Sequence, residues 1–381
     1  MKPLSVSLDA SAVPLQPAGA GRYIVELTSA LRSVAELDLS VVTRTGDQER
    51  WETINSAATI IGAVPNARPL RLAYEQIALG RRIAKLGVSV HHGPHYTVPR
   101  NCPVPSVVTI HDMTFFDRPE VHEATKVKFF QSAIRFAANH ASVIVCVSQR
   151  TADRFVDRFS TDVPVVVAPH GIDHERFRPE TDDEGDRATR ERLGLSHAGQ
   201  QIVHIGTLEP RKGIESLLRA FEVLAESLPE SELVFAGQRG WGLEAFDRAI
   251  ANSPVKDRIT LLGYVNDEDL PAIIRSASVL AYPSVDEGFG LPALEGLACG
   301  VPVVTTQGSV MEELCGPAAW LVAPEDHDDL ARGLSRALKQ SDEERRSRRL
   351  EGIERASHFT WARAAELHME AYELAAQRHA R

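Results

Sequence analysis

The sequence predicts an α/β protein made of two consecutive doubly wound, Rossmann-like units. Short apolar runs alternate with amphipathic stretches along nearly the whole chain, which is typical of parallel sheets covered by helices on both faces. A polar, acidic segment from Pro169 to about Gln200 interrupts the alternation, which then starts again. The length of 381 residues also favours two domains of about 150 residues or more each.

The first unit is predicted to begin with a strand at 4–9, followed by a loop rich in proline and glycine. Ile24, Leu27, Leu31 and Val34 then recur at the spacing of one helix face. Further apolar runs predict strands at 39–43, 88–92, 104–110, 142–147 and 163–168.

The second unit is predicted to contain strands at 201–205, 232–236, 259–262, 279–282 and 301–305. Helices are expected to begin near Gly213, Trp241, Asp267 and Leu291. The segment before this unit is expected to connect the domains, with one short helix near 187–193. We expect an N-terminal domain at 1–175 and a C-terminal domain at 176–359, with a last helix at 360–381 that packs back on the first domain.

The composition excludes several classes of protein. Hydrophobic residues make up 43% and charged residues 25%, which are ordinary values for a folded chain. The 52 acidic residues exceed the 42 basic ones, and this net charge of -10 disfavours nucleic acid as a partner. The four cysteines form no CxxC pair, so no zinc ribbon or thioredoxin-like motif is indicated.

The N-terminal residues lack the pattern of a secretory signal, and no apolar run is long enough to span a bilayer. We therefore expect a soluble, cytoplasmic protein. Two DxD-like segments, 267–269 and 326–328, each precede an apolar helix and are interpreted as helix caps. No metal site and no cofactor are expected.

The most informative segment runs from Asp286 to Val304. Glu287 lies in a Gly-Phe-Gly turn and Glu295 about one turn inside a helix that begins near Leu291. Free amides at a helix start attract phosphate, and carboxylates accept hydrogen bonds from sugar hydroxyls. The segment therefore predicts a phosphate site flanked by acids that bind sugar. The alternative is a plain turn with Glu295 on the helix surface.

A second segment, Gly206-Thr-Leu-Glu-Pro-Arg-Lys-Gly213, joins a strand end to a helix start. Its adjacent cations, Arg211 and Lys212, suit a diphosphate, because arginine offers a fixed fork and lysine a mobile charge. Such cations could stabilise a departing diphosphate without metal. The alternative is a solvated basic turn.

In the first unit, His111 directly follows the strand at 104–110, at the sheet edge where ligands bind. It is expected to donate to a sugar hydroxyl or to help place the reacting carbon; the alternative is a structural histidine. Gly19 and Gly21 form a single GxG, and Ile24 stands where a third glycine would be. A nicotinamide site is therefore disfavoured. The N-terminus of the helix beginning near Arg22 could still point into a cleft shared by the two units.

Three motifs together, EGFGLPALEG at 287–296, GTLEPRKG at 206–213 and GAGRY at 19–23, resemble glycosyltransferase family 4. The Phe359-Thr-Trp361 segment resembles the C-terminal crossover of that family. The resemblance spans nearly the whole chain. It implies the GT-B fold, in which two Rossmann-like domains face a central cleft, and a retaining enzyme.

The resemblance also implies roles for the matching residues. Glu287 would hold donor-sugar hydroxyls, Glu295 the ribose, and Arg211 and Lys212 the diphosphate. His111 would contact the donor sugar. Backbone or side-chain contacts with the donor are implied for Gly19, Gly21, Gly206, Tyr264, Val265, Gly288, Phe289, Gly290 and Leu291. Glu209 is less certain, because the family varies at this position.

The implied reaction is metal-independent transfer of a hexose from a nucleotide sugar. The GxGRY loop and the segments at 111–120 and 237–242 look most like the branch that uses GDP-mannose. A UDP-linked glucose or N-acetylglucosamine is the main rival donor. The acceptor would be a glycan or a lipid-linked acceptor in cell-surface polysaccharide or glycolipid synthesis.

Three alternatives remain open. A GT-B nucleotide-sugar epimerase would need no acceptor, and a sugar-nucleotide-binding subunit would have no turnover. The basic residues near one N-terminal helix and those on the next are either ordinary surface or a peripheral contact with the inner face of the cell membrane. These residues are Arg71, Arg81, Arg82, Lys85, Lys126 and Lys128.

Overall fold

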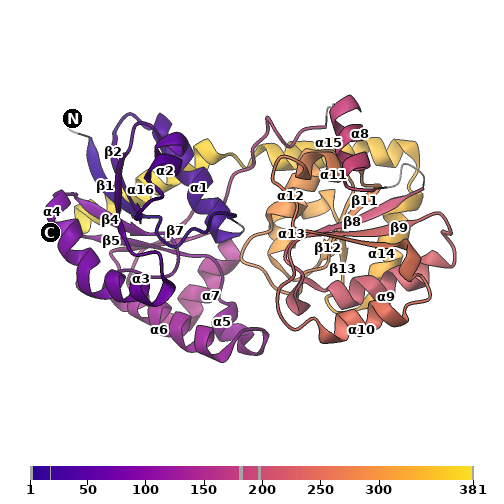
Figure 1. Ribbon diagram of the computed structural model, residues 1–381, viewed down its shortest axis with the longest axis horizontal. Coiled ribbons are helices and arrows are strands. Elements are labelled where there is room, and N and C mark those ends of the chain that lie inside the picture. Colours follow the sequence, from indigo (N-terminus) through magenta and orange to yellow (C-terminus); the bar gives the residue numbers. More distant parts are fainter. Residues whose placement is uncertain (1–2, 18, 180–182, 196–198, 380–381) are drawn as a thin grey trace. The chain divides into compact units, whose positions relative to one another are not determined.

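The structure is a computed structural model that describes residues 3–17, 19–179, 183–195 and 199–379. The chain divides into two compact units, each of which is described here by itself. Unit 1 comprises Met1–Gly171 and Thr360–Arg381, and unit 2 comprises Ile172–Phe359. Both units are Rossmann-like, with a parallel sheet between layers of helices (Figure 1).

Unit 1 contains a seven-stranded parallel sheet with the order β3-β2-β1-β4-β5-β6-β7. The chain runs outward from β1 to β3 and then returns to the other side of β1, which is the doubly wound topology. The strands are β1 (Leu4–Asp9), β2 (Leu37–Arg44), β3 (Thr59–Val64), β4 (Val90–Gly93), β5 (Ser106–Ile110), β6 (Val143–Cys146) and β7 (Val165–Val167).

Separate apolar clusters cover the two faces of this sheet. Alternate residues of β6 show the division, because Val143 packs with α1 and α16 whereas Ile144 packs with α6 and α7. The helices are α1 (Ala20–Ala30), α2 (Gln48–Ile54), α3 (Arg68–Tyr74), the π-helical turn η2 (Glu75–Leu79), α4 (Gly80–Leu86), α5 (Thr114–Asp117), α6 (Ala124–His140), α7 (Gln149–Phe159) and α16 (Trp361–His379), with short 3₁₀ turns η1 (Leu31–Ser33) and η3 (Pro119–Val121).

Unit 2 contains a six-stranded parallel sheet with the order β10-β9-β8-β11-β12-β13. The strands are β8 (Gln201–Ile205), β9 (Glu232–Ala236), β10 (Ile259–Gly263), β11 (Val279–Tyr282), β12 (Val303–Thr306) and β13 (Trp320–Val322). The helices are α8 (Asp183–Arg192), α9 (Ile214–Ala225), α10 (Glu244–Asn252), α11 (Leu270–Ser276), α12 (Leu291–Ala298), α13 (Val310–Cys315), α14 (His327–Lys339) and α15 (Asp342–Ser357), with 3₁₀ turns η4 (Pro210–Lys212), η5 (Lys256–Arg258) and η6 (Gly316–Ala318).

The predicted strands of both units are present, but two edge strands, β3 and β13, were not predicted. Most side chains of β3 are only partly buried, and Gly62 interrupts its apolar run. β13 has three residues, which is too short for a period-two pattern. Edge strands bury less apolar surface than central ones, so their sequences carry a weaker signal.

From Ile172 onward, the segment expected to connect the domains belongs to unit 2. Its helix, α8, begins earlier than predicted and packs against α11. Arg275 on α11 makes two hydrogen bonds of 2.5 and 2.7 Å to the Asp186 carboxylate, and Arg192 lies 2.5 Å from Asp269. The sequence predicts that 267–269 caps this helix. The Asp269 side chain instead binds an arginine and makes no capping hydrogen bond to α11. Asp326 does cap α14, because it accepts the Asp329 amide at 2.9 Å.

The topology of each sheet creates a switch point, where neighbouring strands lead into helices on opposite faces. In unit 1 these strands are β1 and β4, and in unit 2 they are β8 and β11. Ligands of doubly wound folds bind beyond the carboxyl ends of such strands. No helix in the described part of the chain is long and apolar enough to cross a membrane.

Candidate active site

Glu287 is the centre of a compact polar cluster at the switch point of unit 2. Its Oε1 accepts hydrogen bonds from Ser284 Oγ at 2.8 Å and Tyr282 Oη at 3.2 Å, and it pairs with the Lys212 ammonium. Lys212 Nζ also donates to Tyr282 Oη at 3.0 Å. Lys212 follows β8 and Glu287 follows β11, so the fold joins residues that are 75 positions apart in the sequence.

Arg211 connects this cluster to a second acid. Its Nη1 lies 2.9 Å from Glu287 Oε2, and its Nη2 lies 2.6 Å from Glu209 Oε1. The guanidinium thus spans two carboxylates with the two arms of its fork. Two cations and two acids balance each other, and an anionic ligand would have to compete with the acids for the cations.

Electrostatics keeps these groups ionised despite their burial. Burial raises the pKa of Glu287, but the charges of Arg211 and Lys212 have a larger, opposite effect and lower the pKa to about 2. For Lys212, burial lowers the pKa, whereas the Glu287 carboxylate and the Tyr282 hydroxyl raise it. The resulting pKa lies above the ordinary value of a lysine. Both groups are therefore charged at neutral pH.

The backbone between β8 and α9 explains how the two cations are placed. Gly213 has a left-handed φ of 68°, and a Cβ there would lie 2.2 Å from the Pro283 carbonyl oxygen. Only glycine allows this approach, which brings the Arg211-Lys212 turn against the end of β11. The Val285 amide also donates to the Arg211 carbonyl at 2.9 Å.

The segment at 287–296 adopts the predicted turn and helix. α12 begins at Leu291, with Pro292 in its first turn, and Gly290 packs so closely on Met311 that a Cβ would lie 2.1 Å from Met311 Cε. Phe289 is 7% exposed and contacts Phe359 edge to face at 6.0 Å. Gly288 and Phe289 belong to the same turn.

Glu295 lies inside α12 and is 1% exposed. The alternative of a surface helix residue is therefore wrong for Glu295.

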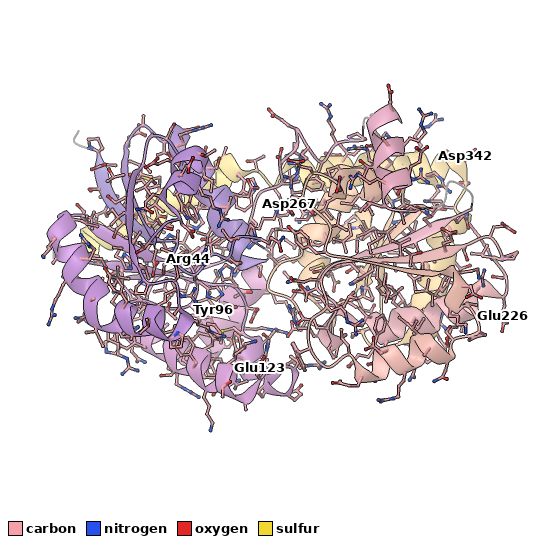
Figure 2. All side chains as sticks on the ribbon, viewed as in Figure 1. Arg44, Tyr96, Glu123, Glu226, Asp267 and Asp342 are labelled. Carbon is pink, nitrogen blue, oxygen red and sulfur yellow. The ribbon has the colours of Figure 1, made fainter. Side chains whose placement is uncertain are left out.

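Three further predicted residues lie at strand ends of unit 2. Gly206 directly follows β8, and its amide donates to Ala236 O at 3.0 Å. Tyr264 and Val265 directly follow β10; the tyrosine is 41% exposed and the valine 7%. Asp267, labelled in Figure 2, marks the loop that these two residues begin.

His111 lies in unit 1, directly after β5, and is 9% exposed. Its Nε2 lies 2.8 Å from Pro94 O, and since a carbonyl only accepts, Nε2 carries the proton. Burial lowers the pKa of His111, so the ring is neutral and its Nδ1 is an acceptor. The expectation that His111 donates to a sugar hydroxyl is thus revised, because this tautomer would accept from one.

Gly19 and Gly21 begin α1 in unit 1. Gly19 is the N-cap with a left-handed φ of 52°, and its carbonyl accepts the Tyr23 amide at 3.1 Å. The helix therefore begins at Ala20, two residues before the expected Arg22. Tyr23 is buried, and its ring lies edge to face with that of His111 at a centroid distance of 5.0 Å. The ring of Tyr96, which is labelled in Figure 2, also lies edge to face with His111, at 5.4 Å.

The sequence analysis missed Tyr282 and Ser284, which bind Glu287 directly. Tyr282 ends β11, and Ser284 follows in the loop before Glu287. The signal for both was available, because polar groups at the end of an apolar strand beside the Glu287 motif lie on the ligand edge. Among the residues that the structure describes, no group of three or more His, Cys, Asp or Glu is arranged to hold a metal ion.

The fold and the site define an α/β protein with two doubly wound sheets and a charged cluster at the switch point of unit 2. The profile described as Glycosyltransferase Family 4 matches residues 17–176, and that described as Glycosyl transferases group 1 matches residues 186–354. O-antigen chain mannosyltransferase B of Escherichia coli is 30% identical over 286 residues, covering 75% of this chain and 74% of the relative. The chain therefore belongs to glycosyltransferase family 4, and it is an enzyme with the GT-B fold.

Two other similar proteins add detail. A GDP-mannose-dependent alpha-(1-6)-phosphatidylinositol monomannoside mannosyltransferase of Mycolicibacterium smegmatis is 34% identical over 181 residues, or 46% of each chain. The solved structure of sucrose-phosphate synthase from Thermosynechococcus elongatus has a TM-score of 0.77 at 20% identity and covers 99% of each chain. This last likeness concerns the fold alone.

Proposed function

We propose that this glycosyltransferase is a retaining, metal-independent hexosyltransferase that moves mannose from GDP-mannose onto a glycan or lipid-linked acceptor. The observation that carries the proposal is the Arg211-Lys212-Glu287 cluster at the switch point of unit 2. It combines cations for a diphosphate with an acid for sugar hydroxyls. The names of the two mannosyltransferase relatives support mannose as the transferred sugar.

The ion pairs suggest how a donor would enter. The diphosphate takes over Arg211 and Lys212, and the released Glu287 carboxylate binds hydroxyls of the sugar. As the bond between the anomeric carbon and the diphosphate oxygen breaks, the two cations stabilise the charge that develops on the leaving group. The acceptor oxygen bonds to the anomeric carbon on the same face, and its proton goes to a diphosphate oxygen.

The first experiment compares thermal unfolding with GDP, UDP and ADP, each in the presence of EDTA. A nucleotide at about 100 times its dissociation constant stabilises the state it binds by about 2.7 kcal/mol. A shift with GDP alone supports the proposed donor. A shift with UDP alone replaces the donor with a UDP-sugar, and a shift that appears only when a divalent ion is added overturns the metal-independent proposal.

Product analysis separates transfer from epimerisation. With GDP-mannose and a mixture of polysaccharide intermediates, a transferase releases GDP and forms a longer glycan. A nucleotide-sugar epimerase would instead yield an epimeric nucleotide sugar and no transferred product. Turnover of either kind would exclude a subunit that only binds the nucleotide sugar.

We also propose that unit 1 rests on an anionic membrane that carries the acceptor. Leu70 on α3 and Ile77 on η2 are 61% and 64% exposed, and Phe129 on α6 is 38% exposed. The helices α3, α4 and α6 also carry basic residues: Arg68, Arg81, Arg82, Lys85, Lys126 and Lys128. Exposed apolar side chains with flanking cations favour the surface of anionic bilayers.

Sedimentation with vesicles tests this membrane contact. The protein is expected to sediment with phosphatidylcholine vesicles only when they contain phosphatidylglycerol, and less at high salt. The variant Leu70→Glu/Ile77→Glu should stay in solution, whereas the control Leu350→Glu, on an exposed side chain of unit 2, should sediment like the unmodified protein. Equal sedimentation of both variants would contradict the proposal.

A further inference from the structure

His204 lies on β8, two residues before Gly206, and is fully buried in unit 2. Its Nδ1 lies 3.0 Å from Ala281 O, and since a carbonyl only accepts, the proton is on Nδ1. Burial lowers the pKa of His204 to about 4, and the neighbouring Lys212 charge also lowers it. At neutral pH, Nε2 therefore carries a lone pair and no proton.

This lone pair has no hydrogen-bond partner among the residues that the structure describes. Buried polar atoms are usually bonded, so an orphaned acceptor at the edge of a ligand site indicates a partner that arrives in another state. His204 played no part in the sequence analysis, because a lone histidine inside an apolar strand carries no motif.

The surroundings of Nε2 identify that partner. The His204 ring stacks with Tyr282 at a centroid distance of 6.1 Å and an interplanar angle of 15°, and Tyr282 Oη accepts from Lys212 Nζ at 3.0 Å. A side chain added at Gly206 would come within 3.9 Å of His204 Nε2 and 4.0 Å of Lys212 Cε. The histidine acceptor and the end of the lysine thus border the same space above Gly206.

Lys212 also has hydrogen-bonding capacity to spare. An ammonium has three N–H donors, and within the described residues Lys212 binds Tyr282 and Glu287. When Glu287 turns to sugar hydroxyls, as the proposed function requires, Lys212 loses one of these two acceptors. A neutral imidazole can replace it without adding a charge that would compete with the diphosphate.

We propose that His204 is a positioning residue for Lys212: in the donor-bound state its Nε2 accepts a hydrogen bond from the ammonium and aims the remaining N–H groups at the diphosphate. The inference rests on the proposed function and deepens it. The chemical partner is a nucleoside diphosphate, and His204 acts on it only through Lys212.

The test measures the dissociation constants of GDP and UDP by calorimetry for the unmodified protein and three variants. His204→Phe keeps a flat ring but removes the acceptor, and His204→Gln places an amide oxygen near the position of Nε2. The control is His91→Phe on β4, because His91 is another fully buried strand histidine with its Nδ1 bonded, at 2.9 Å from Ser7 Oγ.

For the nucleotide that the unmodified protein binds, His204→Phe is expected to raise the dissociation constant about tenfold, the loss of one charge-assisted hydrogen bond. His204→Gln should recover most of that loss, and His91→Phe should bind normally. Circular dichroism and the unfolding temperature establish that each variant is folded. A merely structural role for His204 would not be rescued by an amide.

The outcomes separate this inference from the function on which it rests. If neither GDP nor UDP binds the unmodified protein, the proposed function fails and the inference fails with it. If one binds and His204→Phe binds it equally well, the inference alone is overturned. If both folded His204 variants lose affinity equally, packing and not the lone pair is responsible, which also overturns it.

Discussion

The charge on Lys212 depends on residues that lie far from it in the sequence. The lysine is 8% exposed and keeps its ammonium because Glu287 and Tyr282 surround it. The sequence predicts a diphosphate site at the adjacent Arg211 and Lys212, since two cations follow a strand end. The sequence does not predict their pairing with Glu287, because β9, β10, β11 and the helices α9, α10 and α11 lie between the two segments in the chain.

At the residue scale, Lys212→Ala is expected to reduce turnover about 100-fold. The fold should survive, because Glu287 keeps its bonds to Arg211, Tyr282 and Ser284. Steady-state kinetics with the proposed donor, together with the unfolding temperature, checks both parts. Arg332→Ala removes an exposed cation on α14 of the same unit as a control, and near-normal turnover of Lys212→Ala would contradict the role.

Elements are held in place by contacts that the sequence pattern does not encode. α16 was predicted from its own amphipathic pattern, but five buried side chains of unit 1 connect it to the sheet. His368 Nδ1 donates to Ala364 O at 2.6 Å, so its Nε2 accepts from Tyr23 Oη at 2.7 Å. This series of hydrogen bonds continues from Tyr23 to Thr109, from Thr109 to His92 and from His92 to Tyr372, with distances of 3.0, 2.8 and 2.9 Å.

Which group donates in each of these hydrogen bonds follows from the bond between His368 and the Ala364 carbonyl oxygen. Because Tyr23 donates to His368, it accepts from Thr109, which in turn accepts from His92 Nε2. His92 Nδ1 then accepts from Tyr372. Both histidine rings in this series of hydrogen bonds are neutral, since burial lowers the pKa of His92 and of His368.

Removing one link tests the element-scale argument. Tyr23→Phe removes the acceptor of the Thr109 hydroxyl proton and the donor to His368 Nε2, and is expected to destabilise the protein by about 1–3 kcal/mol. Urea unfolding followed by circular dichroism measures this. The control Tyr74→Phe changes a partly exposed ring in the same unit, and an equally small effect of both would contradict the importance of the chain.

A second prediction concerns the turn that leads into α9. Gly213→Ala should destabilise unit 2 more than Gly308→Ala, although both glycines have left-handed φ angles, 68° and 62°. A Cβ at position 213 would lie 2.2 Å from Pro283 O, whereas none of the described atoms lies within 4 Å of one at position 308. Backbone strain alone costs about 1 kcal/mol, so unfolding temperatures that fall equally would contradict the clash.

At the scale of the whole molecule, buried neutral histidines make stability depend on pH. Burial lowers the pKa of His91, His204 and His368 to about 4 and that of His95 to about 3. The unfolded chain binds protons near pH 6.5 and the folded one does not, so stability is lost as the pH falls from about 6.5 towards 4. Glu75 opposes this, because burial raises its pKa to about 7.

We therefore expect a lower free energy of unfolding at pH 5.5 than at pH 7.5. Each such histidine contributes roughly 1 kcal/mol over the unit of pH below 6.5, and the four together outweigh Glu75. Urea titrations at the two pH values measure the difference. His91→Gln should reduce the difference, while equal stability of the unmodified protein at both values would contradict the account.

Central strands, the turn before α12 and the two motifs that form the charged cluster of unit 2 were predictable, because each depends on residues close together in the sequence. The apolar runs of β8 and β11, the cations after β8 and the acids around α12 are of this kind. The same local signals led to the family. What they could not predict was weakly patterned: the edge strands β3 and β13.

Only the tertiary structure decided which polar groups meet. It placed Tyr282 and Ser284 on Glu287, buried Glu295, and selected the tautomers of His111 and His204 through single carbonyl oxygens. The physical reason is that a hydrogen bond or an ion pair depends on distances of about 3 Å between atoms. Sequence periodicity determines which face of a strand a residue occupies, but the packing of separate strands and helices determines its partner.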